Sequence, residues 1–471
     1  MDEGGAKLAA LEAQADSAFG SLQLWAAAAT SALGGFLFGY DWVVIGGAKP
    51  FYEAHFGITA PQVQAWVMSC ALVGCLIGAI GSGPISERLG RRRTLLISAI
   101  TFAASSIGTG AAASLNEFIA WRMVGGVAIG MASVLSPIYI AEIAPAQIRG
   151  KLVCLNELTI VLGILAAQIV NWLIAVPLAP NATLADLQGS WNELFAWRRM
   201  FEAAVVPASV FLLGLAFIPE TPRWLAKQGH WDSARAVLTK LGGADYATEV
   251  ISQMRTAFAS HPSQPQHEPR IRPVLVIGIT LAVLQQWCGI NVIFNYAQEV
   301  FSAAGYNLSG ILFNIVITGV TMCVFTFVAI ATVERLGRRA LMLFGCGSLA
   351  LIYVLIGYCY HTHQAGVLLL GLIVAAIAAY AMTLAPITWV ILSEIFPNAV
   401  RGTLMAICTA SLWAACFALT YSFPLLNASI GTAGTFWFYA GICVAGFVFV
   451  LRYLPETKQK SLEDIQSLWQ D

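Results

Sequence analysis

Long apolar windows alternate with short charged loops along most of the chain. A helix that crosses a bilayer needs about 20 apolar residues, and windows of that length occur six times on each side of a polar middle stretch. They lie at roughly 22–46, 62–86, 94–113, 117–140, 150–176, 200–218, 274–300, 308–333, 340–360, 366–392, 403–426 and 432–454. The pattern predicts an all-α membrane protein with twelve transmembrane helices.

The composition supports this prediction. Of 471 residues, 58% are hydrophobic and only 11% are charged, whereas a soluble chain carries about 25% charged residues. Because so few charged residues cannot cover the surface of a protein in water, we expect the chain to lie in a lipid bilayer. The formal net charge is zero and no patch mixes basic with aromatic residues, which argues against nucleic acid as a partner.

Three charged signatures occur once in each half of the chain, in the same order. Such a repeat is typical of membrane transporters. It predicts two related six-helix bundles. The pairs are Glu87–Arg92 with Glu334–Arg339, Glu142 and Arg149 with Glu394 and Arg401, and Pro219–Thr221 with Pro455–Thr457. The predicted divisions are a cytoplasmic segment (1–21), the first bundle (22–218), linker helices (219–273), the second bundle (274–454) and a cytoplasmic tail (455–471).

The placement of Lys and Arg predicts the orientation. Cytoplasmic loops carry an excess of these residues, and with twelve spans nearly all of them fall on the side that holds both termini. The exceptions outside the spans are Lys49, Arg198 and Arg199. We expect a multi-pass protein of the cell (inner or plasma) membrane with both termini in the cytoplasm. The polar linker is predicted to form short amphipathic helices under the membrane, with an irregular connector as the alternative.

Asp41 is an acid inside the first apolar window, where a charge costs roughly 3 kcal/mol on insertion scales. Arg122, in the fourth window, is the only basic residue deep inside a predicted span and is the natural partner. Pairing favours the charged carboxylate, whereas burial favours the neutral form. A conformational change that alters the pairing would therefore change the affinity for a proton. The pair is a candidate for proton coupling, and the alternative is a static ion pair that joins two helices.

The seventh window carries four uncharged amides, Gln285, Gln286, Asn291 and Asn295. Their spacing places them loosely on one helical face if the helix is partly unwound at Gly289. Amides both donate and accept hydrogen bonds, as neighbouring sugar hydroxyls require. The alternative is that they join helices by hydrogen bonds.

Two tryptophans, Trp389 and Trp413, lie at membrane depth in the tenth and eleventh windows. Their rings offer apolar walls for the C–H face of a sugar. Ordinary packing against lipid or core is the alternative for either ring.

The repeated charged loops lie on the predicted cytoplasmic face. Because acidic residues are interspersed with basic ones, ion pairs between helix ends could hold the two halves together there, and breaking them would permit inward opening. The alternative is anchoring by positive charge alone. The predicted gate charges are Glu87, Arg88, Arg91, Arg92, Glu142, Arg149, Glu334, Arg335, Arg338, Arg339, Glu394 and Arg401.

No motif predicts an enzyme, a cofactor or a metal site. The six histidines are scattered, no GxxxxGK[ST] motif occurs, and no Cys/His group has metal-ligand spacing. Energy for transport must therefore come from a gradient.

Together these motifs resemble the sugar porter family of the major facilitator superfamily over essentially the whole chain. The matching runs are Gly39–Asp41, both charged repeats, Pro219–Arg223, Gln285–Asn291, Pro386–Pro397 and Pro455–Lys458. The resemblance implies a sugar site between two six-helix bundles, alternating access, and a short cytoplasmic helical segment between the halves. It also implies sugar contacts at Phe38, Gln285, Gln286, Asn291, Trp389 and Trp413.

Other positions refine the resemblance. Gln168 is similar to a fifth-span glutamine of animal glucose transporters, while Asp41 and Arg122 match the acid and arginine of proton-coupled bacterial and plant members. Animal facilitators have an uncharged residue in place of Asp41. The chain departs from the family's pocket pattern at Met322, Asn295 and Leu412, so either a pentose or a hexose fits the resemblance.

We therefore expect a monomeric transporter that imports a monosaccharide together with protons by alternating access. A facilitative uniporter with a purely structural Asp41–Arg122 pair is the alternative. A non-transporting sugar sensor on the same scaffold is a further one.

Overall fold

The computed structural model describes residues 22–145, 148–177, 187–259, 271–303, 308–364, 366–396 and 401–456. These ranges are almost entirely helical, and 11 helical runs within them are long and apolar enough to cross a membrane. The last run contains two spans, because α19 (Arg401–Tyr453) turns at Gly431, where φ is 72°. The prediction of twelve spans is therefore confirmed.

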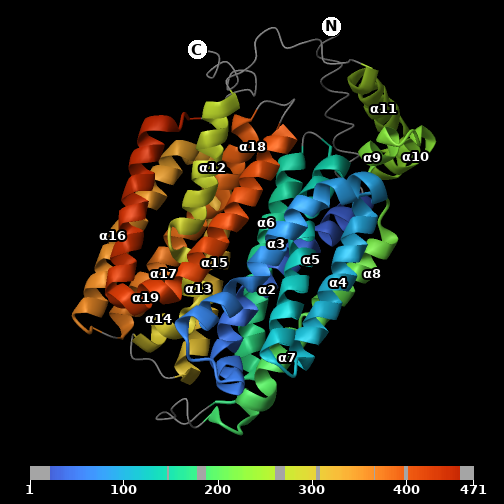
Figure 1. Cartoon of the computed structure of the whole chain (residues 1–471). Helices are drawn as coiled ribbons and strands as arrows, with labels where there is room; N and C mark the ends of the chain where they lie inside the picture. The colour runs from blue at the N-terminus through green and yellow to red at the C-terminus, as the bar shows by residue number, and fades with distance from the viewer. Residues whose placement is uncertain are drawn as a thin grey trace.

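The first six candidate spans, between Leu22 and Phe217, form one bundle (Figure 1). Within it, α2 packs against α6, while α3 and α4 both pack against α5. The elements are α2 (Leu22–Phe56), α3 (Pro61–Leu89), α4 (Arg91–Ala111), α5 (Leu115–Ile143), α6 (Arg149–Ile174), and a sixth span made of the π-helical turn Asn192–Ala196, α7 (Trp197–Glu202) and α8 (Val205–Phe217).

The C-terminal half forms the second bundle beside the first (Figure 1). Its first span is broken at Gly289, where φ is 89° and where a Cβ atom would lie 2.7 Å from the Tyr439 ring. The predicted unwinding at this glycine is confirmed. The elements are α12 (Ile271–Trp287), α13 (Ile290–Asn295), α14 (Ala297–Ala303), α15 (Leu308–Leu336), α16 (Arg338–His361), α17 (Val367–Met382), α18 (Leu384–Ile395) and the two spans of α19.

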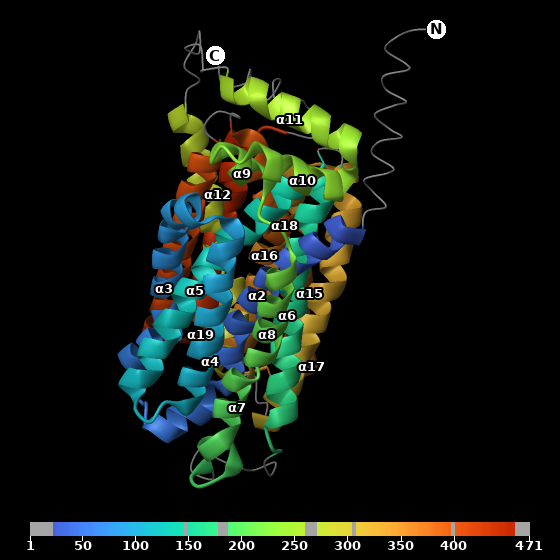
Figure 2. The same ribbon diagram turned by 90° about the vertical axis from the view of Figure 1, so that its right-hand side faces the viewer.

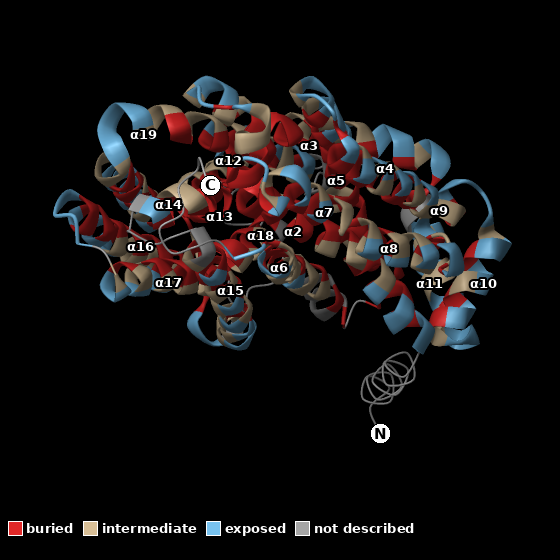
Figure 3. Cartoon of the chain, turned by 90° about the horizontal axis from the view of Figure 1, so that it is seen from below, coloured by how far each residue is buried: buried red, intermediate tan, exposed pale blue. Residues whose placement is uncertain are grey.

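The halves meet along three sets of helices. α3 packs against α19, α6 packs against α15, and α2 packs against α13 and α14. Seen along the spans, buried residues lie between the helices and exposed ones face outward (Figure 3). Many of the exposed side chains are large and apolar, for example Ile80, Leu213 and Phe327. An apolar outer surface of this kind requires lipid rather than water.

Three short helices lie across one end of the spans, α9 (Pro222–Lys227), α10 (Trp231–Gly242) and α11 (Ala244–Ala259) (Figure 2). The described part of the predicted linker is therefore helical rather than irregular. We call this end of the molecule the linker end and the opposite end the distal end. α2 starts at the linker end and continues to Phe56, ten residues beyond the window predicted for it. The prediction stopped short because Lys49 interrupts the apolar run.

Glycines allow α3 and α5 to touch along their backbones. Gly74 and Gly78 of α3 face Gly126 and Gly130 of α5 in two G-x-x-x-G patterns. A Cβ atom on Gly126 would lie 2.0 Å from the carbonyl oxygen of Ala71. Without a hydrophobic driving force between helices in lipid, such close approach is a main source of association.

Candidate functional site

Asp41 and Arg122 form an ion pair in the interior of the N-terminal half. The Nη1 group of Arg122 in α5 donates to Oδ1 of Asp41 in α2, and the two residues are only 4% and 8% exposed. The guanidinium also lies 5.3 Å from the ring centroid of Phe201. Removing one partner of such a buried pair leaves an uncompensated charge, so each side chain of the pair depends on the other for neutralisation.

The ion pair borders a small cavity between the halves. Its volume is about 20 Å³, enough for about one water molecule. Asp41 and Arg122 line it together with Phe38, Asn295 and Trp413. The structure thus brings three of the predicted sugar contacts next to the predicted proton-coupling pair, in a state too closed for a sugar ring.

An aromatic cluster forms one wall of this cavity. The ring centroids of Phe38 and Trp413 are 5.3 Å apart, and Trp42 lies 5.5 Å from Phe38 and 6.1 Å from Trp413. The contact joins α2 of one half to α19 of the other. The sequence interpretation did not include Trp42, although its position four residues after Phe38 places both rings on one helical face.

Three of the predicted amides form a chain of hydrogen bonds. Asn291 donates to Oε1 of Gln286 at 2.6 Å, and Gln286 donates to Oε1 of Gln285 at 3.4 Å. Gln285 in turn donates to the carbonyl oxygen of Ala385 in α18 at 2.8 Å. The chain orients the amides on both sides of the break at Gly289.

Of the remaining predicted contacts, Asn295 lines the cavity, whereas Gln168 and Trp389 do not. The Oδ1 atom of Asn295 is buried without a hydrogen-bond partner among the described residues. Gln168 donates across the halves to Oγ1 of Thr318 at 3.4 Å. Among the described residues that line the cavity, neither Gln168 nor the half-buried Trp389 appears.

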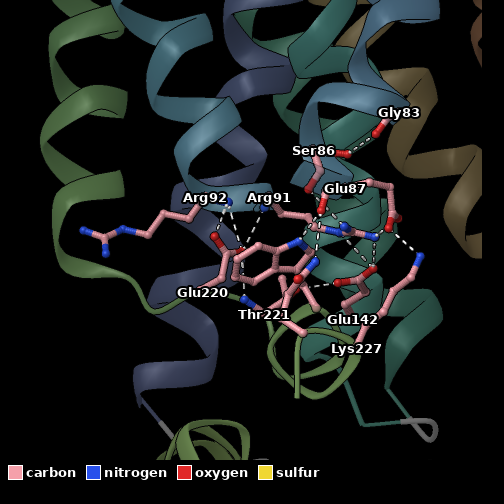
Figure 4. Close-up of polar contacts among 11 residues, drawn as sticks. Gly83, Ser86, Glu87, Arg91, Arg92, Glu142, Glu220, Thr221 and Lys227 are labelled. Carbon is pink, nitrogen blue, oxygen red and sulfur yellow. Dashed lines mark hydrogen bonds and ion pairs between the residues drawn. The ribbon is translucent and has the colours of Figure 1, made fainter. Parts of the chain in front are cut away.

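At the linker end of the N-terminal half, the first charged signature forms a compact cluster (Figure 4). Arg91 pairs with Glu87 at 3.0 Å and with Glu142 at 3.2 Å. Glu220 accepts hydrogen bonds from the backbone N–H groups of Arg91 and Arg92 at 3.0 and 3.1 Å. A carboxylate at a helix N-terminus compensates the unpaired N–H groups there.

The second signature repeats these contacts in the C-terminal half. Glu456 accepts from the backbone N–H groups of Arg338 and Arg339 at 2.9 and 3.1 Å, and Arg338 pairs with Glu394 at 2.9 Å. The charged signatures that repeat in the sequence therefore make equivalent contacts in the two halves. Gly90 and Gly337 precede the two helices with φ of 96° and 88°, and at each a Cβ atom would meet the capping carboxylate, Glu220 or Glu456, within 3.0 Å.

The ion pairs that the structure describes in these two clusters do not join the halves, so the gate between the halves stays a prediction. The ion pairs described at Glu87, Arg91, Glu142, Arg338 and Glu394 lie within one half, not between the halves, because each arginine reaches the neighbouring helix ends of its own bundle. Arg88 and Arg335 are exposed and Arg92 and Arg339 half-buried. The predicted charges whose side chains lie outside the described part of the structure are Arg149, Glu334 and Arg401.

Comparison with known proteins finds sugar transporters that are similar over nearly the whole chain. The family described as "Sugar (and other) transporter" matches residues 27–469. The D-xylose-proton symporter of Escherichia coli (strain K12) is 34% identical, with 96% of this chain and 97% of that protein covered. The arabinose-proton symporter of Bacillus subtilis (strain 168) is 36% identical, with 93% of each chain covered.

Solved structures of the xylose transporter XylE from E. coli have the same fold. Its inward-open form gives a TM-score of 0.81 at 33% identity, covering 95% of this chain and 100% of that one. A partially occluded inward-open form gives 0.82, covering 93% and 99%. The form bound to 6-bromo-6-deoxy-D-glucose gives 0.77 at 34% identity, covering 95% and 99%.

Proposed function

Because the chain belongs to the sugar transporter family, we propose that it imports a monosaccharide together with protons by alternating access. The resemblance inferred from the motifs is confirmed by the family match, and the similar proteins are named as proton symporters of xylose and arabinose. The observation that carries the proposal for this chain is the buried Asp41–Arg122 pair beside the cavity. A pentose or hexose would bind between the halves.

The coupling would follow from competition for Asp41. Either Arg122 or a proton can neutralise the buried carboxylate, and the two states differ in how firmly α2 and α5 are joined. A ligand shifts a conformational equilibrium only by its differential affinity for the two states. Protonation of Asp41 and binding of sugar to the adjoining cavity would therefore favour the same change, since both act on the face of α2 that carries Phe38 and Trp42.

Sugar recognition would combine the amide chain with the aromatic wall. Gln285, Gln286 and Asn291 offer donors and acceptors for hydroxyl groups, and the rings of Phe38 and Trp413 offer apolar faces. The present cavity of about 20 Å³ admits no sugar, so the loaded form would have a larger separation of the halves.

The proposed location is the cell membrane, with the linker end facing the cytoplasm and the chain acting as a monomer. Arg88, Arg91, Arg92 and Arg93 lie at the linker end, and basic residues concentrate on the cytoplasmic side of membrane proteins.

The proposal is tested by uptake into proteoliposomes. Labelled D-xylose and D-glucose are offered with an inward proton gradient and without one. Accumulation above the external concentration is expected only with the gradient. Equal uptake under both conditions would instead indicate a facilitative uniporter, and binding without uptake would indicate a sensor.

The amide chain has its own test. Gln286→Ala is expected to weaken sugar binding about tenfold, or ~1.4 kcal/mol, because it removes a polar contact and leaves the Asn291 amide without its acceptor. Isothermal titration of the purified protein measures this. Gln253→Ala, at an exposed position of α11, is the matched control. Unchanged affinity in Gln286→Ala would mean that the amides only join helices.

A further inference from the structure

Lys49 is a buried cation near the distal end of α2. It is 2% exposed, although lysine is almost never buried to this extent unless it is paired. Two carboxylates contact its ammonium group. Glu53, one turn further along α2, lies 2.9 and 3.0 Å away with its two oxygens, and Glu299 of α14 forms the second ion pair. We call Lys49, Glu53 and Glu299 the distal cluster.

The distal cluster joins the two halves. Glu53 belongs to the same helix as Lys49, whereas Glu299 belongs to the C-terminal half. The ring of Tyr296, also from that half, has its centroid 5.9 Å from the ammonium nitrogen. By contrast, the ion pairs of Arg91, Arg122 and Arg338 described above lie within one half.

The backbones of the two halves are also in contact beside the cluster. One turn before Lys49, a Cβ atom on Gly46 would lie 2.5 Å from the carbonyl oxygen of Phe294 in α13. The hydroxyl of Tyr296 donates to the carbonyl oxygen of Thr420 in α19 at 2.6 Å. The Lys49–Glu299 pair therefore forms where α2 is pressed against α13 and α14, and it must break when the halves part at this end.

We propose that the distal cluster is a gate in which Lys49 exchanges between two states of pairing. In the distal-closed state it holds both Glu299 and Glu53. When the distal end opens, Glu299 moves away with its half, and Glu53, four residues from Lys49 on the same helix, remains as the partner of the ammonium. The inference rests on the proposed alternating access. It adds the residues that set the equilibrium between the distal-closed and distal-open states.

This arrangement gives the two glutamates opposite effects. Without the Glu299 charge, the closed state loses the attraction between the halves. Without the Glu53 charge, the closed state keeps Glu299 as a partner for Lys49, whereas opening separates the ammonium from every carboxylate of the cluster, so the closed state is favoured. Two neighbouring carboxylate-to-amide changes should therefore shift the same equilibrium in opposite directions.

The test measures the distance between spin labels at the distal end of the full chain in lipid nanodiscs. Gln62 of α3 and Gln364 after α16 are exposed there, one in each half, and are replaced by cysteine. Cys323 is half-buried and is replaced by serine together with Cys154, whereas the other eight cysteines are buried. Pulsed electron paramagnetic resonance then gives the populations of short and long distances between the two spin labels, without sugar and without a proton gradient.

Glu299→Gln is expected to raise the ratio of open to closed populations about tenfold, and Glu53→Gln to lower it. The triple variant Lys49→Gln/Glu53→Gln/Glu299→Gln, which leaves no buried charge in the cluster, is expected to open like Glu299→Gln. Shifts of the same sign in the two single variants, or a closed distal end in both Glu299→Gln and the triple variant, would overturn the proposal. Because this readout is conformational, a failure here leaves the uptake result intact, and a failure of proton-driven uptake leaves this result intact.

Discussion

Asp41→Asn is expected to abolish the uphill accumulation of sugar and to leave the exchange of sugar across the membrane. The amide is nearly isosteric with the carboxylate but cannot bind and release a proton in the physiological range. In the wild type, one proton per sugar would give roughly tenfold accumulation per pH unit of gradient, since one unit is ~1.36 kcal/mol. In the variant the internal and external concentrations should become equal.

The measurement is paired uptake and counterflow in proteoliposomes. Counterflow needs sugar binding and the movement of the halves but no net proton transfer, so it also reports that the variant is folded. That control matters because Arg122, 4% exposed, loses its partner in Asp41→Asn. Glu117→Gln, at an exposed position of α5, makes the same chemical change away from the site and should accumulate sugar as the wild type does. Continued uphill uptake by Asp41→Asn would exclude Asp41 as the coupling residue.

Gly126→Ala is expected to destabilise the N-terminal half by roughly 3 kcal/mol, the upper range for overpacking of a tight core. The new methyl group would lie 2.0 Å from the Ala71 carbonyl oxygen. A backbone atom of a packed helix cannot move aside as a flexible side chain can, so α3 and α5 must separate. Thermal unfolding in detergent, followed by intrinsic fluorescence, should show a clearly lower Tm.

The matched control is Gly441→Ala in α19. No atom lies within 4 Å of a Cβ at that position, and alanine is favoured over glycine inside helices by ~1 kcal/mol. Its Tm should be unchanged or raised. Equal Tm changes in both variants would mean that loss of helix flexibility, rather than contact between α3 and α5, controls the effect.

Much of the architecture was determined by the sequence alone. In lipid every backbone polar group must be bonded within a helix or a closed barrel, so the apolar windows translate directly into spans, and the charged repeats divide them into two bundles. Asp41 and Arg122 were assigned to each other for a similar reason. A buried charge needs a partner, and the spans offered Asp41 only one deep basic residue.

Pairing at the linker end depended on tertiary structure. The sequence shows that Arg91 and Arg338 lie near acidic residues, but not to which bundle each acid belongs. Choice of partner is decided by which helix ends are adjacent in space, and these proved to be ends of the same half. The sequence likewise did not show which of the predicted sugar contacts lie together. In the structure some line the cavity, three amides form a hydrogen-bonded chain, and Gln168 and Trp389 belong to neither group.

The distal cluster and the glycine contacts were likewise decided only by the fold. In the sequence, Lys49 is only a basic residue outside the cytoplasmic loops, just after an apolar window. Its pairing could not be predicted, because its partner Glu299 is 250 residues away. Gly126 reads as one glycine among 42. Composition and periodicity show that a segment must lie in a bilayer or that a buried charge must have a partner, because both depend on the segment's own residues. Which segment satisfies the need depends on packing between distant helices, and that is a property of the three-dimensional structure.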